Sequence, residues 1–274
     1  MIDTHCHIVY GVDDGSDCAE ESLEMARIAV DSGITDIIAT PHCIRGMFEN
    51  FVGRVYEESF ERLEELISEN GFVNKLKIHR GMEAFADENT LKDFDRGMLA
   101  RMAGSDYLLI ECDFGEDPWV LRSVLKGLLE RSVIPIVAHP ERYYFAHDSL
   151  RYLFDYVDMG CVLQLDTESI TGAFGRECRS AAFSLLESGA AQLAGSDAHD
   201  SLERRPDMRR AADLVADTVS NRYAELLFDI NPARLLENKR LLFRQSRSSE
   251  PEGRKPRTNR RNEGFMSDEE YWGI

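Results

Sequence analysis

The 274-residue sequence lacks the segments that mark membrane and secreted proteins. It contains no run of about 18 or more apolar residues, the length needed to cross a bilayer. Its N-terminus does not show the basic, then hydrophobic, then small-residue pattern of a signal peptide. We therefore expect a cytoplasmic protein with no membrane insertion.

Cysteine is present, but not in the patterns that carry cysteine chemistry. The six cysteines form no C-x-x-C pair, which argues against a zinc ribbon and against a secreted disulfide framework. None is followed by an arginine six positions later, the spacing that thiolate-based phosphatases need to hold a phosphate. We expect the thiols to be reduced and mostly buried.

Acidic residues outnumber basic ones. Lys and Arg total 32 and Asp and Glu total 50, which gives a formal net charge of -18. Binding a nucleic-acid backbone needs a cationic face, so we expect no nucleic-acid partner. The segment "RQSRSSEPEGRKPRTNRR" is an exception, because it is basic and almost free of apolar residues. We therefore expect one domain over residues 1–240 and a basic, disordered tail over 241–274.

The chain up to about residue 240 alternates short apolar runs with longer stretches of helical period. In the stretch after the first run, Asp17 and Glu20 resemble a capping pair, and Gly33 marks a helix end. The apolar runs predict seven strands, over residues 1–7, 35–42, 76–85, 107–112, 134–142, 162–169 and 192–199.

Strands separated by helices favour parallel pairing with right-handed connections. An open doubly wound sheet and a closed barrel both satisfy this pattern. Nearly every run carries a His, Asp or Glu at its carboxyl end, and seven such ends meet around one point only in a closed ring. The sequence therefore predicts an α/β barrel of about seven strands, with its site at the carboxyl ends of the strands.

The polar residues at these ends have the types and spacing of metal ligands. Residues two apart on a strand face the same side, so His5 and His7 can bind one ion, and Asp197 and His199 repeat that spacing. Imidazoles and carboxylates without thiolates favour Mn²⁺, with Fe²⁺ or Zn²⁺ as alternatives. Nine candidates exceed the coordination of one ion, so we expect two or three ions with a carboxylate such as Glu83 bridging. The candidates are His5, His7, Asp14, His42, Glu83, Glu111, His139, Asp197 and His199.

A cluster of cations favours phosphoryl chemistry, because it lowers the pKa of a bridging water and binds phosphoryl oxygens. A hydroxide is then the expected nucleophile. Arginine matches a phosphate bidentately, and Arg142 lies three residues after His139. Arg204 and Arg205 follow the last metal pair, and either is a candidate for holding substrate. Asp14 is a candidate ligand or water-orienting base.

Other side chains near the strand ends are weaker candidates for the site. His79 and His147 do not end a strand, and alternation turns Cys6 away from His5 and His7. Aromatic walls would suit a phosphotyrosine substrate. The candidates for such walls are Phe48, Phe51, Phe85 and Phe114.

Together these motifs resemble the PHP (polymerase and histidinol phosphatase) superfamily of metallo-phosphoesterases. The resemblance rests on His5-x-His7, "ATPH", "GMEAF", "LIEC", "AHPERY" and "SDAH", in this order and at the strand ends. Within the superfamily, the first 42 residues are similar to bacterial manganese-dependent tyrosine phosphatases of capsule and exopolysaccharide operons. The likeness covers about residues 1 to 240.

The resemblance implies a distorted TIM-like (β/α)7 barrel with up to three metal ions, Mn²⁺ in particular. It also implies hydrolysis of phosphotyrosine on a partner bacterial tyrosine kinase that controls polysaccharide synthesis. Arg142 and one arginine near Arg205 would hold the substrate phosphate. Two alternatives stay open, a small-molecule phosphatase such as one acting on histidinol phosphate, and a non-catalytic scaffold that binds the kinase.

Overall fold

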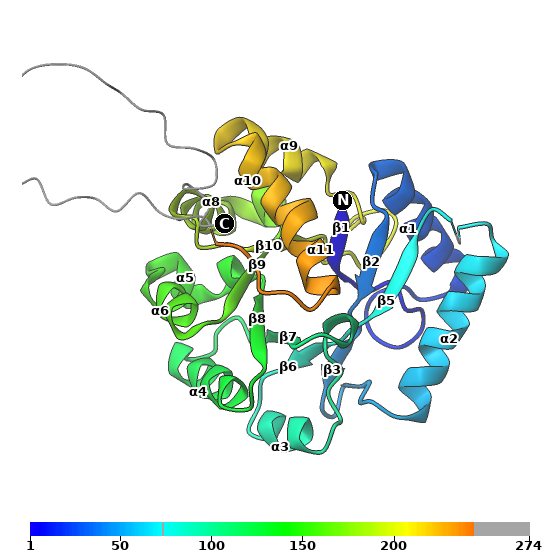
Figure 1. The fold of residues 1–274 in the computed structure, drawn as a ribbon, viewed down its shortest axis with the longest axis horizontal. Helices are drawn as coiled ribbons and strands as arrows, with labels where there is room; N and C mark the ends of the chain where they lie inside the picture. The colour runs from blue at the N-terminus through cyan, green and yellow to red at the C-terminus, as the bar shows by residue number, and fades with distance from the viewer. Residues whose placement is uncertain (73, 244–274) are drawn as a thin grey trace, which may run out of the picture.

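The computed structural model describes residues 1–72 and 74–243 and has an α/β fold, with parallel strands at the centre and helices around them (Figure 1). The tail predicted for residues 241–274 lies outside the described residues from 244 onward. The strands are β1 (Ile2–Cys6), β2 (Asp36–Ala39), β3 (His42–Ile44), β4 (Phe48–Glu49), β5 (Lys77–Arg80), β6 (Glu83–Phe85), β7 (Tyr107–Glu111), β8 (Ile134–Ala138), β9 (Val162–Asp166) and β10 (Leu193–Gly195).

Helices connect these strands and cover their outer face, as expected for parallel pairing (Figure 1). The α-helices are α1 (Ala19–Ser32), α2 (Arg54–Glu69), α3 (Thr90–Asp95), α4 (Pro118–Leu129), α5 (Tyr144–Asp148), α6 (Arg151–Met159), α7 (Thr167–Thr171), α8 (Gly175–Ser188), α9 (Arg209–Thr218), α10 (Asn221–Glu225) and α11 (Asn231–Leu236). Two short 3₁₀-helices are η1 (Met102–Gly104) and η2 (Pro140–Arg142), and η3 (Leu226–Ile230) is a π-helix.

Two of the seven predicted strands are each divided in two. The run over 35–42 forms β2 and β3, and the run over 76–85 forms β5 and β6. The first break contains Pro41, which has no N–H to donate to a neighbouring strand. The second contains Gly81, where a Cβ would lie 2.7 Å from Ile38 Cγ2, so only glycine allows this approach.

Because of these breaks, the hydrogen-bonded strands form two sheets, in the orders β1-β2-β5 and β10-β9-β8-β7-β6-β3-β4. The divided strands pass from the first sheet into the second. At the other side, His7 N donates to Ala198 O at 2.8 Å and Asp197 N donates to His5 O at 2.8 Å. The seven predicted runs therefore follow one another around a distorted TIM-like barrel, and β4 is an additional antiparallel strand.

The barrel has an apolar layer on each side of its strands. The larger cluster lies between strands and helices and includes Leu108, Val137 and Leu163. A smaller cluster comes from alternate strand residues and includes Tyr107, Leu109 and Ile136. Leu235 of α11 belongs to the smaller cluster, so this helix covers one end of the strands.

The first helix begins later than its predicted cap. Helix α1 starts at Ala19 after Cys18, and no side chain caps it, so the prediction of an Asp17 cap is wrong. Its predicted end is confirmed, because Gly33 adopts a φ of 90° and its N–H bonds to the carbonyls of Ala29 and Val30.

No helix among the described residues is both long enough and apolar enough to cross a bilayer. The six cysteines form no disulfide in the structure, and four of them are buried: Cys6, Cys43, Cys112 and Cys161.

Candidate metal centre

All nine predicted ligands lie together at the carboxyl ends of the strands. Eight of them form three groups in which the ligand atoms lie within 4.8 Å of one another. The groups share His7, His42 and Glu83, so they form one continuous cluster. The first group is His7, Asp14, His42 and His199; the second is His5, His7, Glu83 and Asp197; the third is His42, Glu83 and Glu111.

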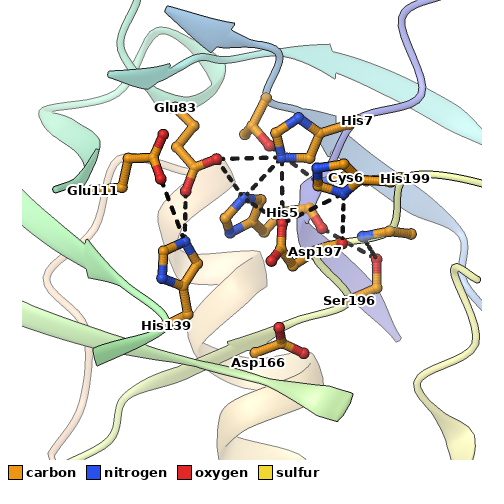
Figure 2. A network of polar contacts seen from close by, with 12 residues as sticks. His5, Cys6, His7, Glu83, Glu111, His139, Asp166, Ser196, Asp197 and His199 are labelled. Atoms are coloured by element: carbon orange, nitrogen blue, oxygen red, sulfur yellow. Dashed lines mark hydrogen bonds and ion pairs between the residues drawn. The ribbon is translucent and has the colours of Figure 1, made fainter. Parts of the chain in front are cut away.

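The first strand and the residue that follows it supply two imidazoles to the same point, as the alternation predicts. The Nε2 atoms of His5 and His7 lie 3.2 Å apart, and both rings are buried. Each Nε2 approaches Glu83 Oε2, at 3.1 and 3.3 Å, and Asp197 Oδ1, at 3.2 and 3.3 Å. Figure 2 shows these four side chains converging on one point.

Glu83 links the second and third groups. Its Oε2 atom also lies 3.0 Å from His42 Nδ1, and its Oε1 atom lies 3.0 Å from His139 Nε2. Glu111 approaches the same two imidazoles, at 2.8 Å from His42 Nδ1 and 3.8 Å from His139 Nε2. His139, the ninth predicted ligand, thus contacts the cluster through these two carboxylates (Figure 2).

The structure differs from the sequence prediction at Asp197 and His199. Strand β10 ends at Gly195, and Asp197 adopts a φ of 49°, so the two residues do not alternate on a strand. Asp197 joins His5 and His7, whereas His199 Nε2 lies 3.4 Å from Asp14 Oδ1. The two side chains therefore belong to different groups, and they do not repeat the geometry of His5 and His7.

Hydrogen bonds behind the cluster orient its imidazoles. His7 Nδ1 lies 2.8 Å from Asp13 Oδ2, and His5 Nδ1 lies 2.8 Å from Gln164 Oε1. These contacts turn the Nε2 atoms toward the cluster, a role that acidic and amide partners have around metal ligands. The loop that carries Asp13 packs so closely that a Cβ at Gly15 would lie 2.3 Å from His7 O.

The cluster buries polar atoms that protein groups alone leave unsatisfied. Four such atoms make no hydrogen bond of acceptable geometry: His42 Nδ1, Glu83 Oε2, Glu111 Oε1 and His139 Nδ1; the two carboxylate oxygens only approach His42 Nδ1, at 3.0 and 2.8 Å. A buried acceptor without a partner is costly, and a divalent cation among carboxylates and imidazoles removes this cost. The donor set therefore fits Mn²⁺, Fe²⁺ or Zn²⁺.

The pKa values show how strongly the cluster favours positive charge. Burial opposes the imidazolium form of His42, but Glu83 and Glu111 outweigh it and raise the pKa of His42 to about 10. A hydrogen bond with His199 lowers the pKa of Asp14 to about 2. Ligand imidazoles must be neutral, so cation binding has to displace protons from this cluster.

Two arginines stand beside the cluster. Arg142 Nη1 lies 2.9 Å from Asp197 Oδ2 and 3.6 Å from Asp166 Oδ2. Arg204 Nη2 lies 2.5 Å from the same Asp197 oxygen. Arg205 is exposed and lines a separate depression with Glu168, so Arg204 is the member of the adjacent pair that faces the site.

Aromatic rings hold both guanidinium groups. The Arg142 guanidinium lies 4.6 Å from the ring centre of Phe114 and 4.2 Å from that of Phe174. The Arg204 guanidinium lies 5.7 Å from the Phe174 ring. Phe174 therefore contacts both arginines, within the range of cation–π attraction.

The cluster and the arginines open into a cavity of about 270 Å³. Three of the four predicted aromatic walls line it, and Phe51 instead lies under the Arg45 guanidinium at 4.9 Å. Ile44 and Met47 add further apolar surface. The lining aromatic residues are Phe48, Phe85 and Phe114.

The remaining histidines lie outside the three groups. His79 Nε2 contacts Asp36 Oδ1 at 2.8 Å, and His147 Nε2 contacts the Glu141 carbonyl at 3.0 Å. Both positions agree with the sequence interpretation.

Three residues at the site were not predicted from the sequence. Gln164 and Asp166 lie two apart on β9 and face the cluster and Arg142, and Figure 2 includes Asp166. Their period of two on a predicted strand is a signal that could have found them. Phe174 lies in the turn between α7 and α8, where no periodicity points to the site.

Comparison with known proteins agrees with this geometry. Residues 1–237 match the family model described as "Capsular polysaccharide synthesis, CpsB/CapC". The chain belongs to the CpsB/CapC family.

Curated members of the CpsB/CapC family are similar to the chain over most of their length. Tyrosine-protein phosphatase YwqE of Bacillus subtilis is 30% identical, over 89% of this chain and 94% of the relative. Tyrosine-protein phosphatase CpsB of Streptococcus pneumoniae is 28% identical, over 86% of this chain and 98% of the relative.

Solved structures support the same family assignment. One from a study of YwqE and CpsB, described as metal-dependent tyrosine phosphatases, superposes with a TM-score of 0.83 at 29% identity. It covers 89% of this chain and 97% of its own. A histidinol phosphate phosphatase from Lactococcus lactis shares the fold at 15% identity, with a TM-score of 0.55 over 83% of this chain and 94% of its own.

Proposed function

We propose that the chain is a metal-dependent protein-tyrosine phosphatase. The proposal rests on the cavity in which Arg142 and Arg204 lie beside the cluster of nine predicted ligands, seven of which are buried. A phosphate needs both a cationic surface and a nucleophile at neutral pH. The named activity of the CpsB/CapC relatives supports the same reaction.

The side chains divide the work of binding and hydrolysis. Arg142 and Arg204 donate to the phosphate oxygens, since a guanidinium pair matches the anion bidentately. Bound cations would supply Lewis acidity and a nucleophile from water at neutral pH. Asp14 is half-exposed at the mouth of the cavity, where it completes the first group or orients the attacking water.

The metal would be held by His5, His7, Asp14, His42, Glu83, Glu111, His139, Asp197 and His199, with Mn²⁺ as the proposed ion. Two or three ions fit the three groups, because Glu83 belongs to two of them and can bridge. The substrate tyrosine would lie between the apolar walls formed by Phe48, Phe85 and Phe114.

The proposed substrate is a phosphotyrosyl protein, specifically a bacterial tyrosine kinase that regulates capsular or exopolysaccharide synthesis. The capsular name of the family supports this choice, and we propose that the enzyme acts in the cytoplasm.

Phosphate release tests the proposal. The full chain is incubated with a phosphotyrosyl peptide, a phosphoseryl peptide and histidinol phosphate, with added Mn²⁺, with Zn²⁺ or with a chelator. We expect turnover of the phosphotyrosyl peptide with Mn²⁺, and none in His5→Ala. Turnover of histidinol phosphate alone would favour a small-molecule phosphatase. Turnover of no substrate with metal present would favour a kinase-binding scaffold.

A further inference from the structure

A second depression adjoins the catalytic cavity. Its volume is about 500 Å³, and Phe114 and Arg142 line both spaces. The other walls include Tyr144 of α5, Phe174 and Arg176 at the start of α8. A molecule bound at the two arginines of the cavity can therefore extend into this depression without leaving the surface.

Arg176 carries the available positive charge of this depression. Within residues 1–72 and 74–243, it has no ion pair and no hydrogen bond, whereas Arg142 is paired with Asp197. Its side chain is exposed. One acid, Glu177, also lines the depression, and it faces His147 Nδ1 at 3.9 Å. An anion entering the depression thus meets a guanidinium whose hydrogen-bonding groups are free.

Tyr144 gives the depression a surface that a peptide side chain can contact. It lines the depression and is 64% exposed, so its ring is accessible there. Its backbone N–H donates to Phe114 O at 2.8 Å, which ties this wall to the catalytic cavity.

Peptide geometry connects the two spaces. Successive residues of an extended chain are about 3.3–3.6 Å apart, and the two spaces share Phe114 and Arg142, so residues one or two positions from a phosphotyrosine are the ones nearest to the adjoining depression. The chain has a net charge of -18 and repels acidic peptides at long range. A local cation that pairs with an acidic residue would offset this repulsion where the substrate binds.

We propose that this depression is a subsite for an Asp or Glu one or two positions from the phosphotyrosine, with Arg176 as its partner. The inference rests on the proposed phosphatase function and specifies the class of peptide that the enzyme prefers.

Binding measurements test the subsite separately from catalysis. Peptides carry a non-hydrolysable phosphonomethyl-phenylalanine, with Glu or Gln at each of the two positions on either side. Fluorescence anisotropy gives their Kd for the full chain with Mn²⁺. At one position or more, we expect Glu to bind about two- to fivefold tighter than Gln, the range for an exposed ion pair. Arg176→Gln should abolish this preference, and Arg176→Glu should transfer it to a Lys peptide.

Arg179→Gln is the matched control, because Arg179 lies on the same helix and stacks on Phe183 at 5.3 Å. It should keep the preference of the wild type. Equal binding of Glu and Gln at all four positions, or a preference that survives Arg176→Gln, would overturn the subsite. Charge-dependent binding without hydrolysis of the matching phosphotyrosyl peptide would support the subsite and contradict the phosphatase function.

Discussion

Tyr107, Leu109 and Glu111 point to the same side of β7, but they lie in two different regions of the barrel interior, one apolar and one polar. Tyr107 and Leu109 belong to an apolar cluster, and the Tyr107 hydroxyl donates to Lys239 O at 3.0 Å. Glu111 lies among imidazoles, and its Oε1 atom approaches His42 Nδ1 at 2.8 Å without the geometry of a hydrogen bond. Strand β9 repeats the change from Val162 to Asp166.

The difference shows how one barrel divides stability and chemistry. The apolar cluster stabilises the fold by burying hydrophobic surface with satisfied polar groups. At the carboxyl ends, burial of charged groups costs folding free energy, and a bound cation would offset this cost. Changes in the two regions should therefore act on different properties.

The largest effect is expected at the carboxyl ends. Replacing Glu83 with Gln removes the carboxylate charge shared by two ligand groups. We expect kcat/KM for a phosphotyrosyl peptide to fall by about 10³-fold, or about 4 kcal/mol, together with a loss of bound metal. Glu88→Gln, in the exposed loop after β6, is the control and should retain both. Full activity in Glu83→Gln would remove Glu83 from the site.

A change in the apolar cluster should affect stability instead. Leu109→Ala deletes a fully buried side chain and should cost about 2–5 kcal/mol of unfolding free energy, measured by denaturant titration. The folded fraction should keep its kcat/KM. Leu202→Ala, at a side chain that is 82% exposed, should leave stability nearly unchanged. A larger loss of activity than of stability would show that the two regions are not separate.

The adjacent arginines provide a matched pair of variants. Arg204→Gln should lower kcat/KM by about 10- to 100-fold, because a charged hydrogen bond contributes about 1.5–3 kcal/mol. Arg205→Gln makes the same change outside the cavity and should leave kinetics unchanged. The reverse ranking would mean that the loop adopts another conformation when substrate binds.

The raised pKa of His42 predicts a pH dependence of metal binding. A pKa of about 10 keeps this imidazole protonated at neutral pH in the metal-free chain, and a ligand must be neutral. Mn²⁺ should therefore release protons, and its affinity should rise by up to about tenfold per pH unit for each proton released. Calorimetry in buffers of different ionisation enthalpy measures the number of protons released per Mn²⁺ bound. Zero release would contradict the assignment of His42.

The smallest effect is expected at Phe174. Phe174→Leu keeps apolar volume but removes the ring that contacts two arginines, so KM should rise about two- to tenfold with little change in stability. Phe174→Tyr should restore the wild-type value. Phe183→Leu removes a similar stack on Arg179 and should leave KM unchanged.

Strand periodicity made much of the cluster predictable. His5 and His7 face one point because side chains alternate on a strand, and parallel strands bring Glu83 and His139 to the same edge. The division into two sheets was not predictable. It results from the strand breaks at Pro41 and Gly81, and the break at Gly81 depends on its close packing against another strand, which the sequence does not reveal.

The prediction that Asp197 and His199 alternate on a strand was wrong because both residues lie in the loop after β10. Asp200 Oδ1 accepts hydrogen bonds from the amides of Leu202 and Glu203, each at 2.6 Å, and turns the chain sharply. As a result of this turn, Arg204 faces the cavity and Arg205 does not. No sequence period describes such a turn, so the adjacent arginines could not be distinguished beforehand.

Anomalous diffraction from crystals of the full chain grown with Mn²⁺ tests most directly whether the carboxyl ends of the strands hold cations. We predict two or three Mn²⁺ peaks among the three ligand groups, with Glu83 contacting more than one ion. A cluster without Mn²⁺ peaks, in crystals of a chain that still hydrolyses phosphotyrosine, would contradict the metal-dependent function proposed for this site.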